Sequence, residues 1–81
     1  MNSMTFFDPI KNALDFLAIQ ADSMRGKTLE IGFLRSKERL RVIRLIVDKE
    51  AQKAFYTQAE NEPLKEITAE QLLSIGGVKL L

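Results

Sequence analysis

The spacing of apolar residues changes once along this chain, close to Gly26, and that change restricts the possible folds more than any other feature. Before it, apolar residues recur every three or four positions, as on one face of a helix: Ile10, Ala13, Leu14, Leu17, Ala21 and Met24. After it, every second residue from Leu29 to Phe33 is apolar, which is typical of a half-buried strand. The sequence therefore predicts a helix followed by a strand.

Capping residues set the bounds of two predicted helices. Asp8-Pro9 is a strong helix start and Gly26 a strong stop, so the first helix is expected over residues 9–25. Thr68 with Gln71 three positions later has the form of a capping box. The second helix is expected to begin there and to end at Gly76-Gly77, leaving an apolar tail that we expect to dock on the domain.

The middle of the chain allows two interpretations. Residues 39–48 are rich in β-branched side chains, which favours a second strand that forms a hairpin with the first, and residues 54–58 then form a third. Alternatively, Ser36 caps one long helix over 37–58, which would make the protein mostly α. We expect the first arrangement, a small α+β domain covering residues 1–81, with the order α-β-β-β-α and an antiparallel sheet packed against helices.

Composition narrows the class of protein. The 81 residues are 46% hydrophobic and 28% charged, an ordinary globular profile. Cysteine is absent, and small domains without disulfides or thiolate metal sites often gain stability from another chain, so we expect a homo-oligomer. There is no basic-then-apolar leader pattern and no run of eighteen apolar residues, which predicts a cytoplasmic protein without a membrane segment.

Histidine is also absent, so the commonest general base and the commonest strong nucleophile are both missing. No glycine-rich phosphate loop precedes a predicted helix. Asp8, Asp15 and Asp22 repeat every seven residues, but successive members would lie roughly 10 Å apart along a helix, too far to share a cation. We therefore expect a binding protein with no catalytic residues, no cofactor and no metal.

Two sets of apolar residues are predicted to lie outside the single core. Phe16 and Ile19 lie off the main apolar stripe of the first helix, and Ile43, Leu45 and Val47 would share one face of the second strand. Either Phe6, Phe7 or the C-terminal tail covers the helix side, or these positions bind a partner protein. The favoured hypothesis is a non-catalytic protein–protein interaction module that forms a homodimer through these two patches. An accessory protein of a phage, plasmid or larger complex would have this profile.

The alternative hypothesis is nucleic-acid binding. Residues 25–53 contain nine basic and four acidic residues, a net charge of +5, although the whole chain carries only +1. Within them Arg35, Lys37, Arg39 and Arg41 occupy alternate positions, so a strand would present all four on one face, with Arg44 as an auxiliary. Such a face can neutralise phosphates.

Overall fold

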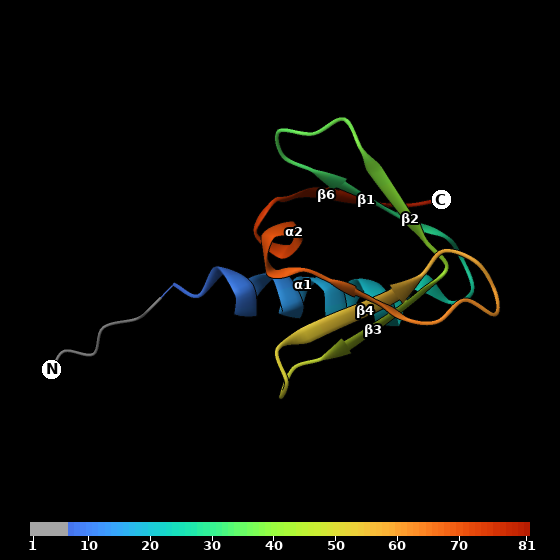
Figure 1. Ribbon diagram of the computed structural model, residues 1–81, viewed down its shortest axis with the longest axis horizontal. Coiled ribbons are helices and arrows are strands. Elements are labelled where there is room, and N and C mark those ends of the chain that lie inside the picture. The colour runs from blue at the N-terminus through green and yellow to red at the C-terminus, as the bar shows by residue number, and fades with distance from the viewer. Residues whose placement is uncertain (1–6) are drawn as a thin grey trace, which may run out of the picture.

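The computed structural model describes residues 7–81 and confirms the α+β class (Figure 1). Two helices and two antiparallel three-stranded sheets follow the order α1 (Pro9–Met24), β1 (Leu29–Phe33), β2 (Arg39–Val42), β3 (Arg44–Asp48), β4 (Lys53–Thr57), β5 (Lys65–Ile67), α2 (Ala69–Leu73) and β6 (Ile75–Leu80). The alternative of one long helix over 37–58 is wrong, because this stretch contributes three strands.

Helix α1 begins and ends as its sequence predicts. The Asp8 side chain accepts a hydrogen bond from the backbone N–H of Lys11 (3.1 Å), and Pro9 occupies the first helical position. At the other end Arg25 adopts the left-handed conformation, followed by Gly26 with φ +79°. The helix contacts β3 and α2, and its buried residues are Leu14, Leu17 and Met24. The predicted apolar stripe therefore forms one side of the core.

The predicted second strand over 39–48 is instead two strands that belong to different sheets. β2 pairs with β1 in the sheet β2-β1-β6, here called sheet A, whereas β3 pairs with β4 in the sheet β3-β4-β5, here called sheet B. A bend at Ile43 separates them, and the Ile43 N–H already donates to the Thr57 oxygen on the sheet B side (2.9 Å). Strands that cross from one sheet to another in this way form the corner between two packed sheets.

The C-terminal region differs most from the prediction. The capping box at Thr68 and Gln71 is present, but α2 contains only five residues. Gly76 and Gly77 do not cap it: they lie in β6, which pairs antiparallel with β1 and carries a bulge at Gly76. The tail therefore docks, as expected, as a strand, and the Leu81 N–H donates to the Thr28 oxygen (2.8 Å). The short strand β5 was not predicted.

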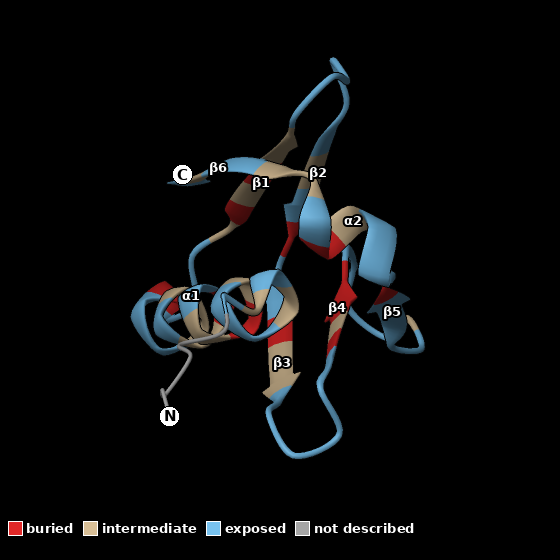
Figure 2. Ribbon diagram, turned by 90° about the vertical axis from the view of Figure 1, so that its left-hand side faces the viewer, coloured by how far each residue is buried: buried red, intermediate tan, exposed pale blue. Residues whose placement is uncertain are grey.

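The core lies between α1 and the inner faces of both sheets (Figure 2). Leu14 and Leu17 of the helix meet Leu29, Ile31 and Val42 of sheet A and Ala54, Tyr56 and Ile67 of sheet B in one buried cluster. The β1–β2 loop and the β3–β4 turn project from opposite ends of the molecule and are exposed (Figure 2). Within residues 7–81, no helix is both long and apolar enough to cross a membrane.

Candidate functional site

Charged residues gather on the outer face of sheet A because of its register. Glu30 of β1 lies directly between Arg41 of β2 and Lys79 of β6, and Gly32 lies between Arg39 and Gly77. Paired residues of an antiparallel ladder project to the same side. The opposite side carries Leu29, Ile31 and Val42, which are fully buried, so the charged side faces outward. We call these six outward residues the basic face: Glu30, Gly32, Arg39, Arg41, Gly77 and Lys79.

Glu30 organises the two arginines of the basic face. The Arg41 Nε donates to one carboxylate oxygen of Glu30 (3.3 Å), and the Arg39 Nε lies 3.9 Å from the other. The Glu30 side chain is 17% exposed, against 57% for Arg39 and 69% for Arg41. The carboxylate therefore lies beneath both guanidinium groups and leaves them open to solvent. Three cations against one anion give the basic face a net charge of +2.

A groove crosses this face at its glycines, two of which make room for neighbouring side chains while one leaves the space empty. A Cβ atom at Gly32 would lie 2.6 Å from Nη1 of Arg39, so the Arg39 side chain occupies the space that this glycine leaves free. In the same way a Cβ at Gly76 would lie 2.9 Å from Cδ2 of Leu34, whereas one at Gly77 would meet nothing within 4 Å. The resulting groove has a volume of about 510 Å³ and runs from Leu34 past Arg39 to Lys79.

The remaining predicted basic residues are not all on this face. Arg35 and Lys37 lie in the exposed β1–β2 loop, where Arg35 is left-handed (φ 63°), so they extend the positive charge beyond the end of sheet A. Arg44 lies on β3, in sheet B, beyond the bend at Ile43. The predicted row is therefore divided by the loop and the bend. Lys79 was missed, because its tail was not predicted to be a strand.

The predicted apolar face at Ile43, Leu45 and Val47 is wrong, since the bend reverses which side points outward. Arg39 and Arg41 face solvent, but Leu45 is only 8% exposed within the core, and Val47 packs against that core. Ile43 alone remains at the surface, at the bend itself. Two of the three residues therefore stabilise the monomer in this structure and are not free to form an outer surface.

Phe16 and Ile19 are exposed, by 40% and 62% respectively. Phe16 lines an apolar groove of about 350 Å³ together with Phe7, Leu73 and Ile75. The C-terminal tail pairs with β1 and leaves Ile19 uncovered. Phe7 is itself exposed, and Phe6, the other residue expected to cover this side, lies outside the described residues.

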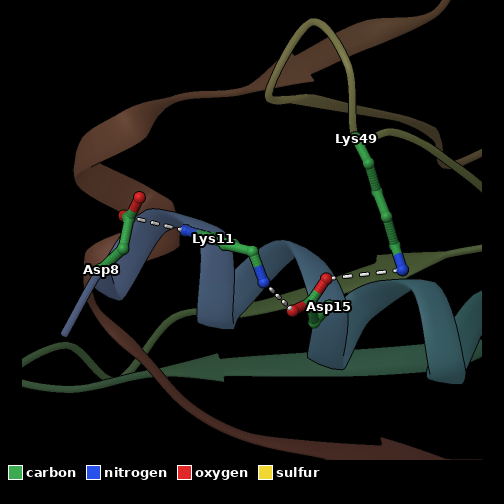
Figure 3. A network of polar contacts seen from close by, with 4 residues as sticks. All are labelled: Asp8, Lys11, Asp15 and Lys49. Atoms are coloured by element: carbon green, nitrogen blue, oxygen red, sulfur yellow. Dashed lines mark hydrogen bonds and ion pairs between the residues drawn. The ribbon is translucent and has the colours of Figure 1, made fainter. Parts of the chain in front are cut away.

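Two of the three regularly spaced aspartates, Asp8 and Asp15, make contacts that stabilise the fold (Figure 3). Asp8 caps the helix, and Asp15 accepts from Lys11 (3.1 Å) while its other oxygen lies 3.4 Å from Lys49 in the β3–β4 turn. The hydrogen bond from Lys11, and after it that from Lys49, lowers the pKa of Asp15. Among residues 7–81, no group of three or more acidic side chains is placed to hold a metal ion.

A scan of protein-family models found no match to this chain, and searches of curated proteins and of solved structures found none either.

Proposed function

We propose that this protein binds nucleic acid without catalysing a reaction, through the basic face of sheet A. The observation that carries this proposal is that β2 and β6 place Arg39, Arg41 and Lys79 on one exposed face, where Arg39 and Lys79 line an open groove. Guanidinium and ammonium groups at the surface neutralise phosphates and release condensed counterions, which is the main source of sequence-independent affinity for nucleic acid. The sequence contains no histidine or cysteine to suggest chemistry on the bound chain.

The distribution of charge supports a polyanionic partner. The basic face and the adjoining β1–β2 loop contain five basic residues, Arg35, Lys37, Arg39, Arg41 and Lys79, against Glu30 and Glu38, a net charge of +3. The rest of the chain then carries −2, because the whole chain carries +1. The net positive charge is therefore concentrated on the basic face and its adjoining loop, which attract a phosphate backbone more strongly than the rest of the surface does.

The structure also changes the balance between the two hypotheses drawn from the sequence. The protein-interaction hypothesis depended partly on Leu45 and Val47, which are occupied by core packing. The nucleic-acid hypothesis keeps Arg39 and Arg41 on one exposed face and gains Lys79. Nucleic-acid binding is therefore the better supported of the two.

Binding to fluorescent oligonucleotides at low salt tests the proposal. With three phosphate contacts on a single strand, the logarithm of affinity should fall against the logarithm of salt with a slope of about −2. The double variant Arg39→Ser/Arg41→Ser should lose most of the affinity and reduce that slope by about 1.4. The matched control is Lys53→Ser/Lys65→Ser, which removes two exposed cations from sheet B. Equal losses in both double variants, or no binding by the natural protein, would refute the proposal.

A second candidate function is self-association into a homodimer through the side of α1. It is supported by the exposed side chains of Phe7, Phe16 and Leu73 around one apolar groove, because large exposed apolar clusters mark interfaces. A second copy is the partner to test first, since an 81-residue domain has a small core and gains from further apolar burial.

Sedimentation over a range of protein concentrations tests this candidate. A dimer that is converted to monomer by Phe16→Asp or Ile19→Asp, but not by Ile43→Asp at the exposed bend between β2 and β3, supports it. A monomer at every concentration removes it, and does so independently of the outcome for nucleic acid.

A further inference from the structure

The groove over the basic face has two chemically different ends. At one end lie Arg39 and Lys79, with Glu30 beneath the guanidinium groups. At the other end the Leu34 side chain lies over Gly76 and is 56% exposed, whereas the side chains of the neighbouring Phe33 and Val78 pack against the core. A ligand that fills the groove must therefore present an anion and an apolar surface side by side.

We propose that this groove holds one nucleotide of a single-stranded nucleic acid, with its phosphate beside Arg39 and Lys79 and its base against Leu34. This inference rests on the proposed function and names the form of nucleic acid that is bound. A duplex offers phosphates on its outside but keeps the faces of its bases stacked, whereas a single strand exposes base and phosphate together. The volume of about 510 Å³ lies within the range of about 300–1,000 Å³ typical of sites for small organic ligands.

Gly77 keeps the centre of the groove open. A Cβ atom there would meet no atom within 4 Å, and its backbone is not in the left-handed region, so a larger residue fits the strand without strain. Valine also has a higher strand propensity than glycine. The variant Gly77→Val should therefore fold normally while placing a branched side chain where the nucleotide would lie, and it leaves every charge of the basic face unchanged.

Fluorescence anisotropy with short oligothymidylate, oligouridylate and the corresponding thymidine–adenine duplex, all at one salt concentration, tests this inference. The natural protein should bind one or both single strands about three times more tightly than the duplex, because the aliphatic Leu34 gives less than the roughly five- to 150-fold gain of a base stacked on an aromatic side chain. Gly77→Val should remove this preference, so that single strand and duplex bind this variant with affinities within about twofold of each other. Stronger binding of the thymidylate or of the uridylate shows which of these two strands the groove prefers.

A second variant tests the same groove in case Gly77→Val does not fold. Leu34→Ser should lower single-strand affinity about threefold, whereas Leu64→Ser, an exposed leucine in the β4–β5 loop, should have no effect. If single strand and duplex bind equally and neither Gly77→Val nor Leu34→Ser changes either affinity, this inference is overturned while nucleic-acid binding stands. If none of the three ligands binds, the proposed function fails as well.

Discussion

Replacing Leu45 by alanine tests whether this residue belongs to the core of the monomer or to an interface. Leu45 is 8% exposed within the cluster between α1 and sheet B, and truncating a buried leucine to alanine costs about 2–4 kcal/mol of unfolding free energy. A domain of 81 residues has a total stability of about 4–12 kcal/mol, so the loss is a large share. Ile43→Ala is the matched control: Ile43 is 37% exposed at the bend, and its truncation should cost about 1 kcal/mol or less.

Urea denaturation followed by circular dichroism measures both losses. At about 4–8 °C for each kcal/mol, Leu45→Ala should also lower the melting temperature by at least about 8 °C. The unfolding free energy that Leu45→Ala loses relative to the natural protein should be the same at low and at high protein concentration. Equal losses for the two variants, or a Leu45→Ala loss that grows with protein concentration, would contradict the placement of Leu45 in the monomer core and return it to an interface.

Three further predictions concern charge and capping. Glu30→Gln should raise the affinity for nucleic acid severalfold, because it removes the only negative charge of the basic face. Weaker binding of this variant in a titration would show instead that Glu30 is needed to orient the arginines. Because Lys11 and then Lys49 lower the pKa of Asp15, this ion pair stabilises the fold above the ordinary carboxyl pKa, and its contribution disappears as pH falls through the lowered value. Lys49→Ala should move the pKa of Asp15 upward in an NMR titration of the side-chain carboxyl, and an unchanged pKa would mean that this contact does not persist in solution. Thr68→Ala should cost about 1 kcal/mol in urea denaturation by removing the capping box of α2, and a loss below about 0.3 kcal/mol would show that this short helix is not limited by its cap.

The parts of the fold that could be predicted are those where independent signals agree. For α1, the capping residue Asp8, the proline after it, the apolar stripe and the stop at Gly26 all indicate the same helix. The capping box at Thr68 likewise located α2. In both cases the signal is local, because a helix satisfies its backbone hydrogen bonds within its own segment.

The parts that were missed depend on distant partners. The bend at Ile43 exists because two sheets share a corner, and nothing in the alternation of residues 39–48 marks it. Once the chain bends, the assignment of faces reverses, which placed Leu45 on the wrong side of its strand. Gly76 and Gly77 have the form of a helix stop, but here glycine serves a bulge and a close approach by Leu34. A lysine in an unassigned tail could not be recognised as part of the basic face.

The most direct test of the central claim is to map the bound surface by NMR. Addition of a short single-stranded oligonucleotide to the isotope-labelled protein should shift the amide signals of Glu30, Gly32, Arg39, Arg41, Gly77 and Lys79 more than those of sheet B and of α1. Shifts concentrated around Phe16 and Leu73, shifts spread over the whole surface, or none at all at low salt would contradict the assignment of the basic face of sheet A as the nucleic-acid-binding surface.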